Sequence, residues 1–167
     1  CDMGPRLAMP IILGSGCHLA ALRWPTLLPG ETALIGWLVV AIWVGLVAAI
    51  HSSIGHRMPS LAQWDLRLRF AVVFTLLAAG TYGLSLGLPG WVLLKILIFA
   101  VLVACGIAVR FGLKPFALAY VQMINEGASE AGNAAMVTHM GVVRRYVWII
   151  WLGLFINAAL GLRVITF

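Results

Sequence analysis

The feature that most constrains this chain is a pair of long apolar segments with almost nothing between them. The segments 70–88 and 91–110 are joined only by Pro89-Gly90. A helix of about 20 residues, rising ~1.5 Å per residue, matches the ~30 Å hydrocarbon core of a bilayer. The pair is therefore predicted to form a transmembrane helical hairpin with a tight turn on one side of the membrane.

Composition extends this prediction to the whole chain. Of the 167 residues, 63% are hydrophobic and 10% are charged, whereas soluble domains carry roughly 25% charged residues. We therefore expect an all-α integral membrane protein with four transmembrane helices and no separate soluble domain. The predicted domain covers residues 33–167, with spans at about 33–50, 70–88, 91–110 and 143–164.

Residues 1–32 are predicted to be an N-terminal leader. Its apolar stretch 7–22 contains Pro10, Gly14 and Gly16, so we expect an interfacial or re-entrant segment rather than another crossing. The chain opens on Cys1, which fits two interpretations: a lipoprotein whose N-terminal cysteine carries lipid, or a chain whose true start precedes this residue. A lipidated Cys1 would lie outside the cytoplasm.

Positive charge predicts the orientation. Four crossings return the C-terminus to the side of the N-terminus, and Lys and Arg are richer in the loops 51–69 and 110–145 than on the opposite side. The positive-inside rule places these loops in the cytoplasm and both termini outside it. The net charge of +6 is explained in this way, and no nucleic-acid partner is expected. Within the second loop, the segment 116–124 either continues the third helix beyond the membrane or lies on its surface.

Small residues are expected to mediate helix packing, because lipid supplies no hydrophobic drive for helix association. Two stripes recur at intervals of four residues and are predicted to face each other. They are Ala79, Gly83 and Gly87 in the second span, and Ala100, Ala104 and Ala108 in the third.

Ionisable residues at membrane depth are the first candidates for function. No Asp or Glu falls within the four predicted spans, which argues against a proton relay or a cation transporter. Lys95 lies one turn after Trp91, and two roles are open to it: snorkelling to the interface, or contact with an anionic cofactor. A transporter would need a broken helix, and Gly80-Thr81-Tyr82-Gly83 is the one candidate break.

Three histidines are candidate metal or haem ligands. His51, His56 and His139 are all expected near the cytoplasmic surface, and imidazole binds copper, zinc and iron. Met136 and Met140 flank His139, and thioethers suit cuprous copper. The alternative is that all three are ordinary interfacial residues, since His51 and His56 are not at a same-face helical spacing. Zinc-protease, serine-hydrolase and phosphate-loop motifs are absent from the sequence, so no enzymatic activity is assigned.

Three short motifs resemble bacterial membrane proteins of the copper-resistance-D-like and HemJ-type (protoporphyrinogen oxidase) families. They are Trp43-Val44-Gly45, Arg67-Leu68-Arg69-Phe70, and a helix that opens with Trp91-Val92-Leu93-Leu94-Lys95 and closes with Arg110. The resemblance implies a bacterial inner membrane location, haem or copper binding, and a functional role for Lys95. In those families a histidine usually precedes the first motif by about two turns, but Gly36 occupies that place here.

Two functions follow from these observations. The first is a non-enzymatic accessory subunit, without a cofactor of its own, that packs among membrane lipids and other integral membrane subunits of a respiratory or photosynthetic complex. The second is a haem- or copper-binding membrane protein that uses Lys95 or the three histidines. Short loops, abundant tryptophan and the lack of buried carboxylates favour the first.

Overall fold

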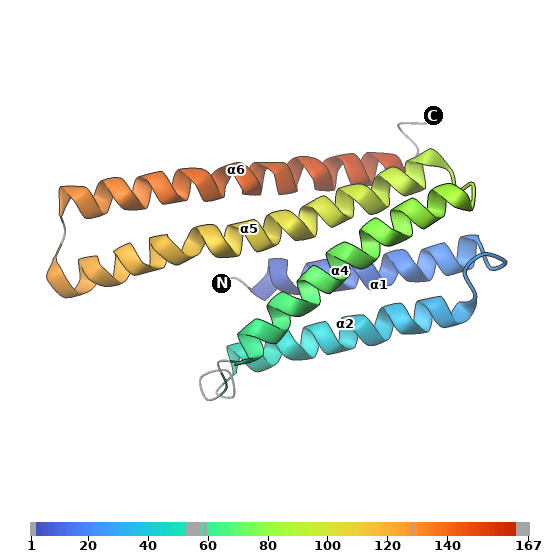
Figure 1. Ribbon diagram of the computed structural model, residues 1–167, viewed down its shortest axis with the longest axis horizontal. Helices are drawn as coiled ribbons and strands as arrows, with labels where there is room; N and C mark the ends of the chain where they lie inside the picture. The colour runs from blue at the N-terminus through green and yellow to red at the C-terminus, as the bar shows by residue number, and fades with distance from the viewer. Residues whose placement is uncertain (1–2, 53–57, 59, 128, 163–167) are drawn as a thin grey trace. The chain divides into compact units, whose positions relative to one another are not determined.

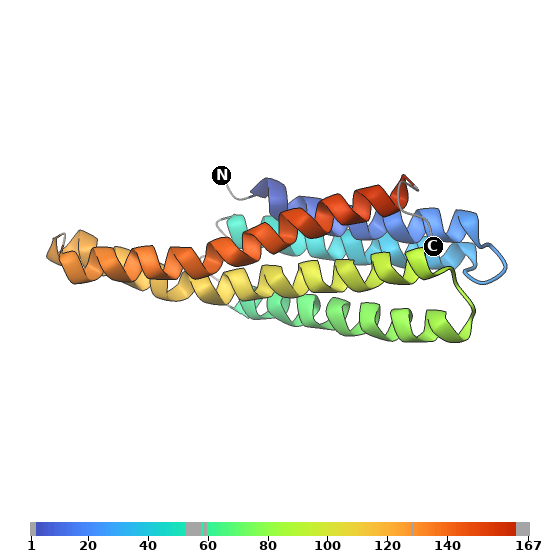
Figure 2. The same cartoon turned by 90° about the horizontal axis from the view of Figure 1, so that it is seen from above.

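The computed structural model describes residues 3–52, 58, 60–127 and 129–162, and these are almost entirely helical (Figures 1 and 2). The structure is 90% helix, with no strand in the part that it describes. Four helices, α2, α4, α5 and α6, are long and apolar enough to cross a membrane. The prediction of an all-α, multi-pass membrane protein is confirmed. The helices are α1 (Met3–Arg23), α2 (Gly30–His51), α4 (Ser60–Ser85), α5 (Gly90–Glu126) and α6 (Glu130–Gly161).

The chain divides into two compact units, Cys1–Leu68 and Arg69–Phe167. The division falls inside α4, so the first unit contains α1, α2 and the start of α4. The second unit contains the rest of α4 together with α5 and α6. Each unit has its own internal packing and is described separately.

In the first unit, α1 and α2 pack closely because glycines face the neighbouring helix. A Cβ atom placed on Gly36 would lie 2.7 Å from Cys17 Cβ, and one on Gly14 would lie 2.6 Å from Val40 Cγ2. Both distances are shorter than real Cβ contacts, so a side chain at either glycine would push the helices apart. Gly36 is therefore a packing residue.

In the leader, α1 runs without a break through Pro10, Gly14 and Gly16. A proline inside a helix removes one backbone hydrogen bond. One turn after Pro10, Gly14 packs against α2, and this contact supports the helix. Residues 7–22 are thus part of one continuous helix. Cys1 lies outside the described residues.

In the second unit, a short turn joins α4 to α5. Gly87 adopts a φ of 67°, a left-handed conformation that favours glycine, and Leu88 N donates a 3.1 Å hydrogen bond to Gly83 O. Pro89 then precedes the first residue of α5, Gly90. The predicted hairpin turn at Pro89-Gly90 is thus present, and Gly87 reverses the chain just before it.

Residues 110–126 and 130–145 are helical, which corrects the prediction of 110–145 as a loop. Helix α5 has 37 residues and α6 has 32, and the two run antiparallel side by side in Figures 1 and 2. Of the two alternatives left open for 116–124, the structure shows the first: this segment continues the third helix. Pro115 is accommodated inside α5.

Local sequence explains where the long helices end. Gly127 follows α5 with a φ of 87°, which other residues rarely adopt. Ser129 then caps α6, because its Oγ accepts a 3.1 Å hydrogen bond from Gly132 N. The connection between α5 and α6 is therefore only residues 127–129.

Candidate functional site

Lys95 lies where α5 passes the C-terminal end of α6. A Cβ atom placed on Gly161, the last residue of α6, would be 2.9 Å from Lys95 Nζ. The glycine makes room for the half-buried ammonium group. The last carbonyl groups of a helix lack intrahelical partners and carry partial negative charge. The site therefore pairs a cation with a helix end, an interaction of about 0.3–1 kcal/mol.

The acidic side chains of the second unit lie far from Lys95 in the sequence. The sequence of this unit contains only two acidic residues, Glu126 and Glu130. Both lie at the other end of the hairpin, roughly 45 Å from Lys95 along α5 at ~1.5 Å per residue. A cation beside a helix end retains attraction for a carboxylate or phosphate group.

Asn157 is a polar residue that the sequence reasoning missed. It lies four residues from Gly153 and four from Gly161, so all three share one face of α6. Gly153 contacts α5, since a Cβ there would lie 2.6 Å from Leu102 Cδ2. Asn157 Oδ1 is buried and accepts no hydrogen bond from the described residues. The sequence alone marks Asn157 as unusual, because no other amide, hydroxyl or charged side chain occurs in residues 147–162.

Asp65 also departs from expectation. The second span was predicted to begin at Phe70, with every carboxylate outside it, but α4 begins at Ser60 and includes Asp65. This carboxylate is 5% exposed, and Arg69, one turn later on the same helix, is 9% exposed. An acid and a base four residues apart in a helix are the sequence signal for such a buried pair of charges.

The histidines do not form a described site. His51 Nδ1 lies 2.8 Å from Val47 O of its own helix, which occupies one ring nitrogen. His139 is half-buried on α6, in the other unit, and His56 lies outside the described residues. In residues 3–52, 58, 60–127 and 129–162, no three His, Cys, Asp or Glu side chains come together as metal ligands.

The packing stripes are placed differently from their prediction. On α4, Gly80 and Gly83 are buried, and Cβ atoms there would lie 3.3 Å and 2.6 Å from side-chain atoms of Leu97 and Leu93. Ala79 is exposed, and Gly87 lies in the turn. The contact face of α4 thus runs through Gly80 and Gly83. On α5, Ala100 is buried, Ala108 is half-buried and Ala104 is exposed.

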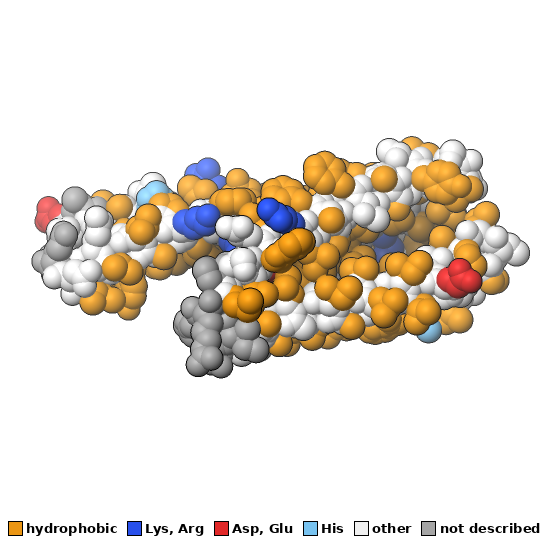
Figure 3. Space-filling view, turned by 60° about the horizontal axis from the view of Figure 1, so that its bottom comes forward, with side chains coloured by type: hydrophobic (Ala, Val, Ile, Leu, Met, Phe, Trp, Pro, Cys, Tyr) orange, Lys and Arg blue, Asp and Glu red, His pale blue; other side chains and the backbone are white. Residues whose placement is uncertain are grey.

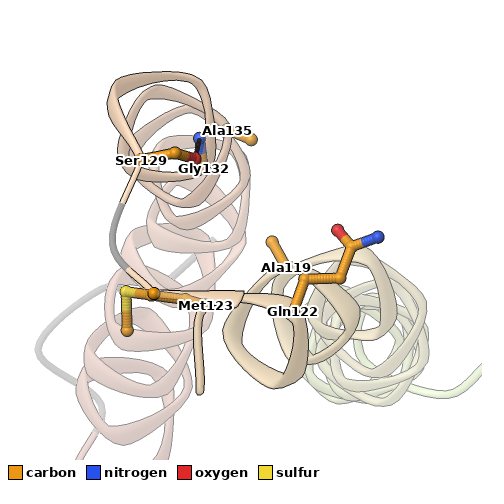
Figure 4. A pocket seen from close by; sticks show the side chains of 7 residues that line it. Ala119, Gln122, Met123, Ser129, Gly132 and Ala135 are labelled. Atoms are coloured by element: carbon orange, nitrogen blue, oxygen red, sulfur yellow. Dashed lines mark hydrogen bonds between the residues drawn. The ribbon is translucent and has the colours of Figure 1, made fainter. Parts of the chain in front are cut away.

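A small cavity of about 270 Å³ lies at the tip of the hairpin, where α5 turns into α6 (Figure 4). Its one hydroxyl, on Ser129, is engaged in capping α6, and Gln122 supplies the one side-chain amide. This lining offers no nucleophile or acid–base pair. The cavity is lined by Ala119, Gln122, Met123, Gly127, Ser129, Gly132 and Ala135.

A second cavity, of about 330 Å³, is an open groove between α5 and α6. It is lined by apolar side chains of both helices and by Gly153, so it suits an acyl chain or another helix rather than a polar substrate. On α5 its lining includes Leu94, Leu97 and Ile98, in the membrane part of the helix.

Part of the α5–α6 hairpin lies outside the hydrocarbon core. At ~1.5 Å per residue, the 37 residues of α5 extend about 55 Å. Even at a tilt of ~40°, the upper end of the usual range, this helix covers about 42 Å of depth, more than the ~30 Å core. Residues Gly90–Arg110 alone fill roughly 30 Å. We call 111–126 and 130–142 the stalk, and 90–110 with 143–161 the membrane half.

These features define the class as a multi-pass α-helical membrane protein with a helical stalk. No protein-family model, no curated protein and no solved structure matches the chain. Its function is therefore argued from its own residues.

Proposed function

We propose that this chain is a non-enzymatic subunit of a larger membrane complex of the respiratory or photosynthetic type. In this proposal, the stalk docks to another integral membrane subunit, and lipid covers the outer faces of the membrane half. The observation that carries the proposal is the apolar surface of the stalk. That surface extends beyond the hydrocarbon core, where lipid tails cannot cover it.

The stalk exposes large apolar side chains on both helices. Leu118 is 68% exposed, Ile124 is 64% exposed and Val137 is 74% exposed. Single exposed apolar residues are common, but a contiguous set on a water-facing segment marks an interaction surface. The full set is Phe111, Leu118, Tyr120, Val121, Ile124, Val137, Met140 and Val142.

The free energy available from burying the stalk's apolar side chains is close to the cost of association. Full burial of one apolar side chain contributes about 1.5–3 kcal/mol, so four such side chains contribute about 6–12 kcal/mol. Association itself costs an estimated ~4–15 kcal/mol. The stalk alone is thus a marginal binding surface, and stable docking requires additional contacts between helices within the membrane.

A native gel of mildly solubilised source membranes tests the proposal, with the chain detected by an epitope tag. The wild-type chain should migrate within a band much larger than its own mass of 18.0 kDa. The double substitution Leu118→Gln/Val121→Gln should release it from that band while its level in the membrane is maintained. Asn125→Gln, an exposed polar position on the same helix, is the matched control and should remain in the band.

Two results would contradict the docking role: a wild-type chain that migrates at its own or its dimer mass, or a double variant that stays in the large band. Absorption spectra of the same bands test the second candidate function, haem or copper binding. The observation that favours this candidate is the position of Lys95, a cation within an apolar segment and beside the end of α6. A haem spectrum that follows the isolated chain and is lost in Lys95→Gln would support it.

A further inference from the structure

Four basic residues lie at one level of the hairpin, where α5 and α6 leave the hydrocarbon core. A Cβ atom placed on Gly112 would be 3.0 Å from Val143 Cγ2, so the residues around Gly112 on α5 are level with those around Val143 on α6. This contact brings together two pairs of cations that are distant in sequence. We call them the basic collar: Arg110, Lys114, Arg144 and Arg145.

The collar faces outward. Lys114, Arg144 and Arg145 are exposed, and Lys114 Nζ lies 5.0 Å from the ring centroid of Phe111. This cation–π contact holds the flexible lysine against its own helix. Figure 3 shows an acidic side chain at the tip of the hairpin and basic side chains farther along it.

The acidic residues of this unit are distant from the three exposed cations of the collar, Lys114, Arg144 and Arg145. Glu126 lies roughly 18 Å from Lys114 along α5, and Glu130 lies roughly 21 Å from Arg144 along α6. Both separations exceed the Debye length of ~8 Å at physiological ionic strength. The exposed cations of the collar are therefore not screened by the unit's own carboxylates.

The depth of the collar matches the level of phospholipid headgroups. Arg110 lies roughly 30 Å from Gly90 along α5, which is the thickness of the hydrocarbon core. On α6, Tyr146 and the exposed Trp148 follow the collar within about one turn toward the membrane. Tyrosine and tryptophan concentrate at membrane interfaces, so these side chains mark the same boundary independently.

We propose that the basic collar binds the headgroups of anionic phospholipids. Arginine donates paired hydrogen bonds to phosphate oxygens, and the two neighbouring arginines of α6 supply two such forks at headgroup depth. A zwitterionic headgroup carries its own cation, which opposes this attraction. The collar should therefore retain phosphatidylglycerol in preference to phosphatidylcholine. This inference concerns lipid and is independent of what docks on the stalk.

Native mass spectrometry of the full chain tests the proposal. The protein is extracted from vesicles containing equal amounts of phosphatidylglycerol and phosphatidylcholine, and the lipids that remain bound are counted. We expect about a tenfold preference for phosphatidylglycerol. Arg144→Gln/Arg145→Gln should reduce the ratio to about one, whereas the charge-preserving Arg144→Lys/Arg145→Lys should keep most of it. Arg23→Gln, an exposed arginine of the first unit, should leave it unchanged.

Three results would overturn the proposal. They are equal retention of the two lipids by the wild-type chain, an unchanged ratio in the glutamine double variant, and an equal loss in Arg23→Gln, which would indicate only a bulk charge effect. Inorganic phosphate exchanged for chloride at constant ionic strength distinguishes the source of the ligand, because competition specific to free phosphate would also overturn the lipid assignment. If the glutamine variant fails to insert, a salt titration of the wild-type chain decides, since the preference must fall as ionic strength rises.

Discussion

The two halves of the α5–α6 hairpin consist of the same two helices but bury their side chains very differently. In the membrane half, Leu102 is 1% exposed and Val103 is 0% exposed. In the stalk, no described side chain of residues 111–125 or 130–142 is buried. The buried side chains of α5 are Leu93, Phe99, Ala100, Leu102, Val103, Cys105 and Ile107.

Part of this difference arises because α4 packs against the membrane half of α5, where Gly80 and Gly83 meet Leu97 and Leu93. In lipid, apolar outer faces carry no cost, and helices associate through close packing such as that of Gly153 against Leu102. In water, each exposed apolar Å² costs about 25 cal/mol relative to burial. Under the proposed function, lipid covers the apolar faces of the membrane half, and a partner subunit covers those of the stalk.

The largest expected effect is in hydrogen exchange. With the isolated chain in vesicles, amides of the stalk should exchange about 100-fold or more faster than amides of the membrane half, because little side-chain packing opposes local opening of the stalk. Exchange detected by peptide mass spectrometry measures both regions in one sample. Equal protection against exchange in the two halves would contradict the expected difference between them. It would show that the stalk is stable without a covering surface.

A substitution in the membrane half should have the next largest effect. Gly153→Leu places a bulky side chain where even a Cβ would lie 2.6 Å from Leu102 Cδ2, so the helices must separate. We expect the free energy of unfolding in mild detergent to fall by about 2–3 kcal/mol.

Gly141→Ala is the matched control for Gly153→Leu. Gly141 lies on the same helix, in the stalk, where an added Cβ meets no atom within 4 Å. This change should be neutral or should stabilise the helix by up to about 1 kcal/mol, because alanine restricts the unfolded chain. If the free energy of unfolding fell by a similar amount in both variants, the membrane half and the stalk would not differ in packing.

The smallest effect is expected at the tip of the stalk. Ser129→Ala removes the hydrogen bond from Gly132 N to Ser129 Oγ, and loss of such a cap costs about 1 kcal/mol. Exchange should accelerate in the first turn of α6, while the unfolding midpoint of the membrane half stays unchanged. Ser129→Thr keeps the hydroxyl and should behave as wild type. A lowered midpoint in Ser129→Ala would mean that the two halves unfold as one unit.

Much of the fold was predictable from the sequence. The four apolar helices and the turn at Pro89-Gly90 follow from hydropathy and from residues that stop helices. The continuation of α5 past Arg110 was left open, because 116–124 is compatible with a projecting helix and with a surface helix. The continuous helix across 7–22 was not foreseen, since the support for Gly14 comes from Val40 of another helix.

The candidate site was predictable only in part. The sequence marks Lys95 as a charge within an apolar segment. Its neighbour Gly161 belongs to a different helix, and nothing in the sequence around Gly161 predicts that the two residues meet. Recurrence of small residues at intervals of four shows that they share a face, but does not show which face meets a neighbour. For that reason the buried positions of α4 include Gly80, whereas Ala79 of the predicted stripe is exposed.

The sequence by itself determined that this chain belongs in a membrane, because the free energy of moving a segment into lipid is close to a sum over its residues. It also determined the excess of basic residues and the scarcity of acidic ones. The tertiary structure decided which glycines separate the helices, that Lys95 lies beside the end of α6, and that the basic collar and the stalk exist as surfaces. These features require two segments to meet, and the distance between two segments is a property of the folded chain rather than of any single residue.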